Sequence, residues 1–310
     1  MGAMAGSKQA QKIAVEVEGR RLQLSNLDKV LYPATGFTKG EVIDYYSRIA
    51  PVLLPHLAGR AATRVRFPDG VDGNSFFEKN APKATPEWVR TVTLPTPGSS
   101  RGRETIDFVV VEDVPTLIWL ANLAALELHV HQWTVGPRGG VHGVDRLVFD
   151  LDPGAPAALA ECAQVALMLR EVLADLGLEA LAKTSGSKGM QLYVGLAETD
   201  PGRTHGFAKD LAVAMEEAHP ELVVHRMEKA LRGGKVLIDW SQNAAAKTTV
   251  APYSLRARVR PTVSTPVTWD EVAEAAEGRE LAFTAPEVLA RVDELGDLFA
   301  PLLTADVRLP

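Results

Sequence analysis

Hydrophobic and polar positions alternate with changing periods along the 310-residue chain, which predicts a mixture of helices and strands. Apolar residues recur three and four apart over 38–59. Thr38 and Glu41 stand there at capping-box spacing and Gly59 closes the run, so we predict a helix that breaks near Pro51. Further helices are expected at 114–128, 155–176 and 204–220 and, rich in acids, after residue 268.

Short apolar runs bounded by Gly, Pro and polar residues predict strands between these helices. The segment "VEVEGRRLQL" predicts a hairpin around Glu18-Gly19. The other strand-like runs are 61–68, 75–80, 105–111, 127–135, 146–152, 178–184, 190–196 and 236–240. No repeat or linker divides the chain, so we expect an α/β (α+β) fold with mixed sheets flanked by helices. One domain is expected over 16–305, after a disordered tail or cloning remnant at 1–15.

Charge and cysteine content limit the chemistry of the site. The net charge is −6, but residues 270–297 hold nine acids and two arginines, so the remainder is close to neutral and can still contact phosphate. Cys162 is the only cysteine, which excludes an internal disulfide and a multi-thiolate zinc site and favours a reducing cytoplasm. No apolar run approaches the roughly 20 residues of a membrane span.

The strand-like segment "RLVFDLDPG" carries two carboxylates near its end. Asp150 and Asp152 are two residues apart, so in a strand they emerge from one face about 7 Å from each other. Such a pair repels unless a cation lies between its members, and Mg²⁺ or Mn²⁺ prefers these oxygens. A simple turn at Asp152-Pro153-Gly154 is the alternative. Asp239 ends another apolar strand, and three acids in this pattern suit a two-metal site for phosphoryl or nucleotidyl transfer.

The segment "KTSGSKGMQ" predicts a loop between two strands that can hold a phosphate. Gly186 and Gly189 allow the backbone to approach a ligand, while Ser185, Ser187 and Lys188 offer donors suited to a triphosphate. The spacing is not that of a Walker loop, and a strand follows it rather than a helix. Taken alone, an ordinary hairpin turn explains the segment equally well.

Histidines, arginines and phenylalanines supply weaker candidates. His129 and His131 share one strand face, and each can be a buried hydrogen-bonding residue or a phosphate donor. Phe76 and Phe77 are adjacent in a predicted strand, so one ring is expected in the core and the other free to stack on a base. The basic clusters, which ordinary surface charge also explains, contain Arg232, Lys235, Arg256, Arg258 and Arg260.

With these segments in order, the chain resembles the polymerase domain of the bacterial LigD repair ligases, a branch of the primase-polymerase (archaeo-eukaryotic primase) superfamily. The resemblance covers most of residues 20–265. It is dense at "LSNLDKVLYPATGFTKGE", "FFEKN", "ALELHVHQW", "RLVFDLDPG", "TSGSKGMQLYV", "GKVLIDWSQN" and "KTTVAPYSLR". It implies a template-dependent nucleotidyltransferase that adds one or a few nucleotides, often ribonucleotides, with two Mg²⁺ or Mn²⁺ ions.

The resemblance also implies residue roles. Asp150, Asp152 and Asp239 resemble the metal-binding catalytic carboxylates of the family. The residues that resemble ligands of the incoming NTP or dNTP are His129, Ser185, Ser187, Lys188, Gln242 and Arg256. Lys29 and Lys39 match the pair that grips a DNA 5′-phosphate, Phe76 and Phe77 match the aromatic residues that stack on the template, and Arg232 lies in the family's basic loop near the primer end.

Three departures from the family pattern bear on the biological role. Gln191 replaces the usual histidine of "SGSKGLH", no ligase or phosphoesterase module is present, and the acidic segment after 268 fits least well. Gln191 and the chain's length favour a free-standing paralogue that fills short gaps in excision repair with a separate DNA ligase. The alternatives are an end-joining polymerase that acts with Ku and a ligase at double-strand breaks, an excised domain, and a non-catalytic module that binds DNA ends.

Overall fold

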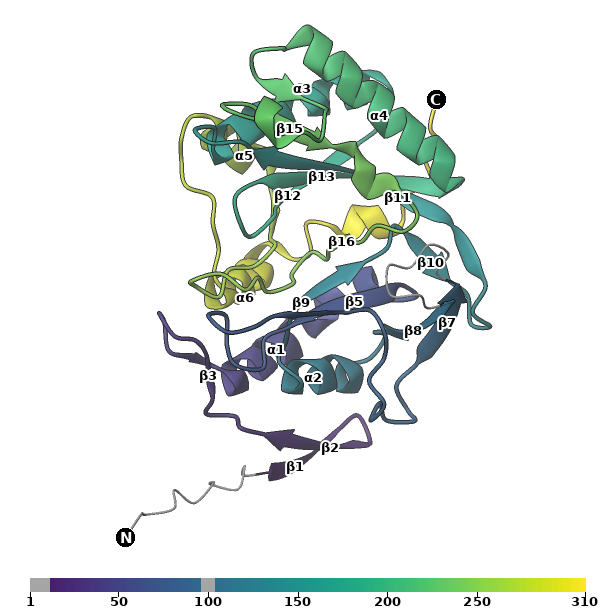
Figure 1. Ribbon diagram of the computed structural model, residues 1–310, viewed down its shortest axis with the longest axis vertical. Coiled ribbons are helices and arrows are strands. Elements are labelled where there is room, and N and C mark those ends of the chain that lie inside the picture. Colours follow the sequence, from purple (N-terminus) through teal and green to yellow (C-terminus); the bar gives the residue numbers. More distant parts are fainter. Residues whose placement is uncertain (1–11, 96–103) are drawn as a thin grey trace.

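The computed structural model describes residues 12–95 and 104–310, in which two main β-sheets lie one above the other with helices on their outer sides (Figure 1). The sheet at the top of the view is called the aspartate sheet. Its strands are β10 (Trp133–Val135), β11 (Val141–Pro153), β12 (Ala180–Thr184), β13 (Met190–Thr199), β14 (Val223–Val224), β15 (Val236–Asp239) and β17 (Pro266–Val267). Their order is β14-β15-β11-β13-β12-β17, with β10 paired to β11.

The lower sheet is called the histidine sheet. Its strands are β5 (Ala61–Arg66), β6 (Phe76–Glu78), β7 (Thr91–Pro95), β8 (Thr105–Val110), β9 (Ala125–Val130) and β16 (Thr249–Val250). Their order is β16-β9-β5-β8-β7, with β6 paired to β5. Two small sheets precede it along the chain, formed by β1 (Lys12–Val17) with β2 (Arg20–Ser25) and by β3 (Val30–Tyr32) with β4 (Phe37–Thr38).

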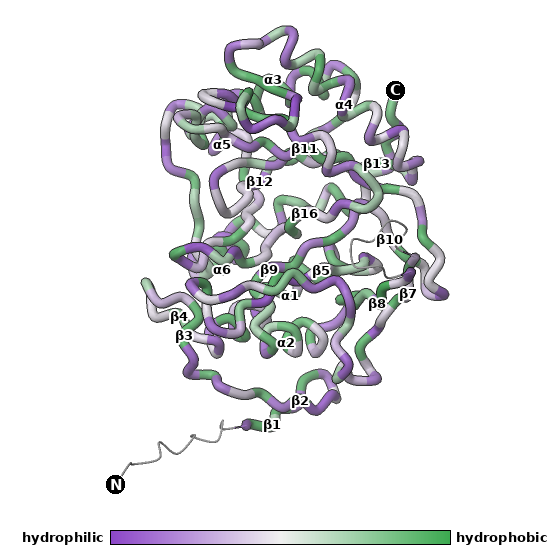
Figure 2. Tube along the Cα trace, in the orientation of Figure 1, coloured by the Kyte–Doolittle hydropathy of each residue, from purple (hydrophilic) through white to green (hydrophobic). Residues whose placement is uncertain are grey.

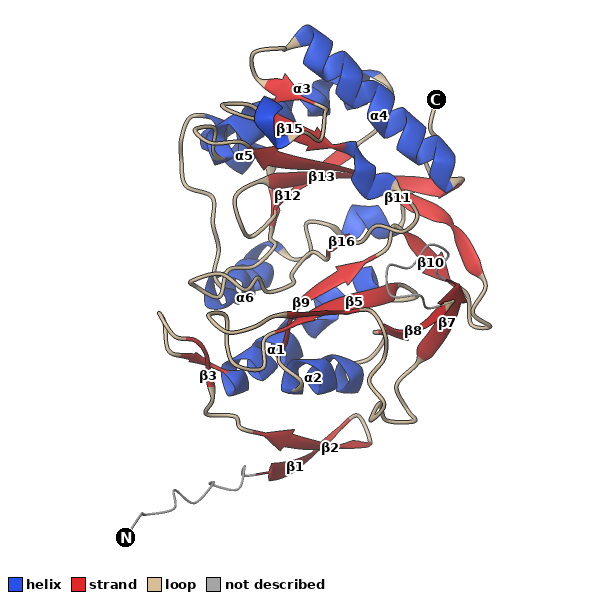
Figure 3. Cartoon of the chain, in the orientation of Figure 1, coloured by secondary structure: helices blue, strands red, loops and turns tan. Residues whose placement is uncertain are grey.

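The helices divide between the two sheets (Figure 3). The hydrophobic core of the aspartate sheet includes residues of α3 (Leu159–Asp175), α4 (Pro201–Ala218) and α5 (Trp269–Ala276). That of the histidine sheet includes residues of α1 (Lys39–Leu57), α2 (Val114–Asn122) and α6 (Ala285–Leu295). Hydropathy alternates along α1 and α3, as expected of helices with one buried face (Figure 2). Three 3₁₀ helices complete the fold: η1 (Lys229–Leu231), η2 (Trp240–Asn243) and η3 (Ala300–Leu303).

The alternation of side chains along β11 determines where the site lies. Leu147, Phe149 and Leu151 are fully buried in the core shared with α3. Successive strand residues point to opposite faces, so Asp150 and Asp152 project from the other face, away from these helices. The segment between β16 and β17 joins the two sheets and carries Arg256 past this face. The aspartates therefore lie between the two layers of the molecule.

The predicted fold class is confirmed, and so are the hairpin around Glu18-Gly19 and the capping box of Thr38 with Glu41. The predicted break near Pro51 is wrong, because α1 is continuous through Pro51 and Pro55. Its buried face, which includes Tyr45, Tyr46, Ile49, Ala50 and Leu53, offsets the backbone hydrogen bonds that the prolines remove.

Other boundaries also differ from the sequence analysis, and the strand predicted at 127–135 is divided into β9 and β10, which belong to different sheets. The helix predicted at 114–128 ends at Asn122, because Ala124 takes a positive φ of 58° and the chain continues as strand β9. The predicted tail at 1–15 is too long, since residues 12–15 belong to β1; residues 1–11 lie outside the described part of the chain. None of the helices within 12–95 and 104–310 is both long and apolar enough to cross a membrane.

Candidate active site

The three predicted catalytic aspartates lie on two adjacent strands. Strands β11 and β15 pair antiparallel, and their register places Asp150 directly opposite Asp239, while Asp152 follows two residues later on the same face of β11. Directly opposed residues of an antiparallel pair have Cβ atoms about 4.5–5.5 Å apart. The sequence could not show that these strands adjoin, and the structure brings all three carboxylates together.

Burial and the nearby carboxylates raise the pKa values of Asp150 and Asp152. Burial and then the nearby Asp152 carboxylate raise the pKa of Asp150 to about 7, although a hydrogen bond from Gln191 favours its charged form. Burial and then Asp239 raise the pKa of Asp152, against the influence of Arg232 and Arg256. A divalent cation bound among the three would relieve this repulsion.

The carboxylate oxygens of the three aspartates suit a hard divalent ion, but they do not by themselves surround one ion position. In the described part of the chain, no three acid, imidazole or thiolate groups converge on one ion position. Asp239 accepts hydrogen bonds from the backbone N–H and hydroxyl of Ser241, at 3.0 and 2.5 Å, and from the Gln242 amide at 2.8 Å. Mg²⁺ is commonly held by one or two carboxylates together with substrate phosphates, so separated oxygen ligands of this kind suit it.

A cleft of about 440 Å³ opens beside the aspartates and collects most of the predicted triphosphate ligands. Its lining residues are Asp150, Asp152, Pro153, Ser185, Ser187, Lys188, Gln191, Arg232, Arg256 and Arg258. The cleft thus combines two acids with cations and hydroxyls. Such a site can hold a phosphate chain and a metal ion side by side.

The loop between β12 and β13 is held tightly against the end of β11. The Ser185 hydroxyl accepts the N–H groups of Ser187 and Gly189, both at 3.2 Å, and the Ser185 N–H donates to the Gly189 carbonyl at 2.9 Å. Gly189 leaves no room for a side chain, because a Cβ would lie 2.0 Å from the Leu151 carbonyl oxygen. The loop therefore presents its donors, including exposed Lys188, next to Asp152.

Glu127 organises two of the predicted triphosphate ligands, and the sequence analysis missed it. Its two carboxylate oxygens lie 2.9 Å from His129 Nε2 and 3.1 Å from Arg256 Nε, and Arg256 also donates to the Ser185 carbonyl at 2.5 Å. Burial would raise the pKa of Glu127, but the bond from His129 and the Arg256 charge lower it to about 2. Glu127 stands two residues before His129, so strand periodicity is the signal that could have found it.

Arg232 and Gln242 reach the aspartates from different directions. Arg232 lines the cleft, and its guanidinium donates to the Met227 carbonyl at 2.5 Å within the same loop. That loop packs on Gly154, where a Cβ would lie 1.9 Å from the Arg232 carbonyl oxygen. Gln242, predicted to bind nucleotide, instead donates to Asp239 and is absent from the cleft lining. The Gln242 side chain therefore orients the Asp239 carboxylate.

The predicted DNA-contacting residues lie on the histidine-sheet side of the molecule. Lys29 Nζ pairs with Asp69 at 2.9 Å, while Lys39 is 5% exposed and donates to the Ser25 carbonyl at 2.6 Å. Burial, followed by the Lys29 and Arg66 charges, lowers the pKa of Lys39 to about 8. The three cations therefore form one basic cluster.

The prediction that one of Phe76 and Phe77 is buried is wrong. Both rings are exposed, at 48% and 54%, because β6 is a three-residue strand paired only with β5. The Phe77 ring lies edge-on to His129, with centroids 6.3 Å apart. This contact places an exposed aromatic surface beside the predicted triphosphate ligands, and both rings are available to stack on bases.

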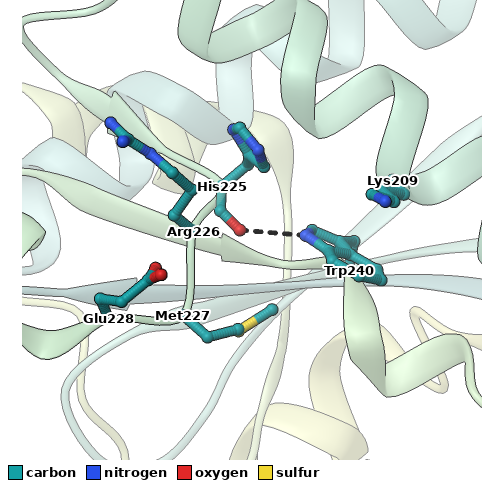
Figure 4. Close-up of a pocket in the computed structure, with 6 residues that line it drawn as sticks. All are labelled: Lys209, His225, Arg226, Met227, Glu228 and Trp240. Carbon is teal, nitrogen blue, oxygen red and sulfur yellow. Dashed lines mark hydrogen bonds between the residues drawn. The ribbon is translucent and has the colours of Figure 1, made fainter.

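A second pocket, of about 520 Å³, is lined by residues 225–228 together with Trp240 and Lys209 (Figure 4). The Trp240 indole donates to the His225 carbonyl at 3.0 Å, and Lys209 Nζ lies 5.4 Å from the ring centroid. Arg226 pairs with Glu216 at 3.0 Å. One carboxylate, that of Glu228, lines this pocket, whereas two aspartates line the aspartate cleft.

Comparison with known proteins identifies the family. The family model "LigD, primase-polymerase domain" matches residues 38–299, which extends the resemblance past residue 265 into the acidic segment. The multifunctional non-homologous end joining protein LigD of Mycolicibacterium smegmatis is 47% identical over 283 residues, which are 91% of this chain and 36% of that protein. The Bacillus subtilis bifunctional LigD is 33% identical over 278 residues, 89% of this chain and 43% of that protein.

Comparison with solved structures identifies the same family. The polymerase domain of Mycobacterium tuberculosis ligase D, solved in complex with DNA, superposes with a TM-score of 0.86 at 44% identity, covering 92% of this chain and 99% of that one. The chain spans less than half of the length of the LigD proteins it matches. Members of the family are nucleotidyltransferases that use divalent metal ions. The chain belongs to the LigD primase-polymerase domain family.

Proposed function

We propose that this protein is a template-dependent polymerase that adds one or a few nucleotides, ribonucleotides in preference, to a primer 3′-hydroxyl opposite a DNA strand with a recessed 5′-phosphate. The observation that carries the proposal is the register of β11 and β15, which sets Asp150 opposite Asp239 at the mouth of a cleft lined by Ser185, Lys188 and Arg256. Acids that hold cations and donors that hold phosphates occur there within one site.

Each group in the cleft has a role in this reaction. Asp150, Asp152 and Asp239 would hold two Mg²⁺ or Mn²⁺ ions, which lower the pKa of the primer hydroxyl and offset the charge of the leaving pyrophosphate. Lys188, Ser185 and Arg256 bind and orient the triphosphate, and Glu127 keeps Arg256 directed at it. Arg232, which lines the same cleft, would contact the primer end.

DNA recognition in the proposal is independent of sequence. Lys29 and Lys39 would bind the 5′-phosphate through charge, and Phe76 and Phe77 would stack on template bases. Asp69 and the Ser25 carbonyl accept hydrogen bonds from these lysines in the absence of DNA and keep the cations in place.

The biological setting we propose is end joining, with Ku and a ligase as partners at double-strand breaks. The relatives at 47% and 33% identity are named as non-homologous end joining proteins, and this supports end joining over the excision-repair gap filling that Gln191 suggested. A direct assay has to separate the two.

The test compares two substrates under Mg²⁺ or Mn²⁺ with each rNTP and dNTP. One is a duplex with a short gap and a 5′-phosphate, and the other is a pair of duplexes with short complementary 3′ overhangs. End joining predicts templated addition on the paired ends that requires the 5′-phosphate of the second duplex and is lost in Asp150→Ala. Addition on the gapped duplex alone would favour gap filling. Tight DNA binding without addition in any metal would indicate a non-catalytic end-binding module.

A further inference from the structure

Four side chains form a straight row across four neighbouring strands of the aspartate sheet. Lys183 on β12 is opposite Gln191 on β13, Gln191 is opposite Asp150 on β11, and Asp150 is opposite Asp239 on β15. Residues directly opposed across strands lie on the same face, about 5 Å apart. The row therefore connects Lys183, which is fully buried, to the mouth of the cleft.

Hydrogen bonds run along this row in one direction. Lys183 Nζ donates to Gln191 Oε1 at 2.5 Å, and Gln191 Nε2 donates to Asp150 Oδ1 at 2.9 Å. Lys183 also donates to Ser264 Oγ at 2.5 Å, and that hydroxyl donates in turn to the Thr184 carbonyl. Each side-chain nitrogen and oxygen of Lys183 and Gln191 thus has at least one partner, as buried polar groups require.

The orientation of the Gln191 amide follows from both of its neighbours. An ionised Asp150 only accepts hydrogen bonds, so it requires the NH₂ end, and the Lys183 amine meets the oxygen end. A flipped amide would set its oxygen against the Asp150 carboxylate. Gln191 is 3% exposed, so water has little access to replace either contact. The Gln191 amide is thus a neutral donor in a fixed orientation. In family members with histidine at this position, the donor would instead be a titratable ring.

We propose that Lys183 and Gln191 form a positioning relay that holds the Asp150 carboxylate by Oδ1 and leaves Oδ2 for a divalent cation. The inference rests on the proposed function, since it assigns these residues to the metal site of that reaction. Gln191 touches the metal-binding carboxylate and Lys183 acts only through Gln191. Partners that orient a metal ligand in this way change metal affinity by about 10- to 100-fold when removed.

A purely electrostatic role and a positioning role of Lys183 predict opposite changes in metal affinity when the lysine is replaced. If Lys183 acted only as a nearby cation, Lys183→Met would remove repulsion and tighten binding of a divalent ion. In the relay, the same change releases the Gln191 amide and weakens that binding. The direction of the change therefore separates the two explanations.

The test is Mn²⁺ affinity, measured by the loss of the free-ion electron paramagnetic resonance signal without DNA or nucleotide. We expect Gln191→Leu to weaken Mn²⁺ binding by about tenfold or more, and Lys183→Met by several-fold. The double variant Lys183→Met/Gln191→Leu should bind no more weakly than Gln191→Leu alone, because Lys183 acts through Gln191. Additive losses, or tighter binding by Lys183→Met, would overturn the relay.

Two controls keep a general loss of stability apart from the relay. Gln132 is another buried glutamine, 3% exposed, whose amide donates to Thr249 and does not contact an aspartate. Gln132→Leu should leave Mn²⁺ affinity unchanged, and thermal melts verify that each variant is folded. If wild-type protein binds Mn²⁺ and Gln191→Leu binds it equally well, the relay alone is wrong. If wild-type and Asp150→Ala are alike in binding none, the proposed function fails and the relay with it.

Discussion

The aspartate cleft and the basic cluster around Lys39 both gather like charges, but the protein treats them differently. Asp150 and Asp152 project from one face of β11, where burial and the neighbouring carboxylates raise their pKa values. Lys29 and Lys39 instead have an Asp69 carboxylate and a Ser25 carbonyl as partners. The buried carboxylates would gain most from a bound cation that relieves their repulsion, whereas the lysines can exchange their present acceptors for a phosphate.

The two regions also differ in how they are built. The acids project from central strands whose register is determined by a fully buried opposite face, so their relative positions are rigid. Lys29 precedes strand β3, Lys39 begins α1, and Phe77 lies in the short strand β6, so neighbouring segments decide their exposure. We infer that the cleft carries out the chemistry and the cluster positions the DNA. The predictions below test this division.

The largest effect should come from removing one carboxylate of the cleft. Asp150→Asn preserves size and burial but loses the charge that holds a metal ion, which is worth several kcal/mol in the transition state. We expect nucleotide addition to fall by at least about 10³-fold, while affinity for 5′-phosphorylated DNA stays the same. Single-turnover primer extension and fluorescence anisotropy measure the two quantities. Equal losses in both would contradict the division.

The converse change removes a lysine of the basic cluster. Lys39→Met deletes a charge-assisted hydrogen bond worth about 1.5–3 kcal/mol, so affinity for DNA with a 5′-phosphate should drop by about 10- to 100-fold. Affinity for the same DNA with a 5′-hydroxyl should hardly change. The exposed Lys12 provides a matched control, and Lys12→Met should bind both DNAs as wild type does. A preference for the 5′-phosphate that survives in Lys39→Met removes this assignment.

A pH titration sharpens the same assignment. Burial and the Lys29 and Arg66 charges lower the pKa of Lys39 to about 8, so its ammonium is present at pH 7 and mostly lost by pH 9.5. The preference for a 5′-phosphate should therefore shrink by about tenfold over this range, and Lys39→Arg should flatten the profile.

Unfolding does not account for such a loss. The unfolded chain binds the Lys39 proton up to about pH 10.5, and the folded chain releases it near pH 8, so this group makes folding more favourable as pH rises between these values. A flat wild-type profile from pH 7 to 9.5 would show that Lys39 does not supply the recognition charge.

The smallest effect is expected at Arg256. Arg256→Lys keeps the positive charge, but a lysine cannot contact Glu127 and the Ser185 carbonyl at the same time. The variant therefore loses one of the two contacts that orient this cation. We expect the nucleotide KM to rise by about fivefold, corresponding to about 1 kcal/mol, with kcat little changed. Steady-state kinetics on a gapped duplex provide the measurement. A fall in kcat with an unchanged KM would place Arg256 in the chemical step instead.

The sequence predicted the cleft better than its surroundings. Strand periodicity put Asp150 and Asp152 on one face, and that inference needs only local geometry. The pairing of β11 with β15 is a long-range contact, so the meeting of Asp150 with Asp239 had to come from the structure. Glu127 was open to the same local reasoning, because it shares a strand face with His129, and it was missed.

Other errors have tertiary causes. The continuous helix α1 shows that packing of Tyr45, Ile49 and Leu53 outweighs the local effect of Pro51. Phe76 and Phe77 are both exposed because no element of the described residues covers the three-residue strand β6, which no local pattern reveals. Gln191 was visible as a departure from the family pattern, but its role needed Lys183 on the neighbouring strand to be seen.

Anomalous diffraction from crystals soaked with Mn²⁺ and a nucleoside triphosphate would test the central claim most directly. The account predicts manganese peaks in the cleft, with oxygens of Asp150, Asp152 and Asp239 at bonding distance and the triphosphate beside Ser185 and Lys188. In Asp239→Asn crystals at least one peak should weaken or vanish. Manganese and triphosphate bound elsewhere, with these three carboxylates free of metal, would contradict the account.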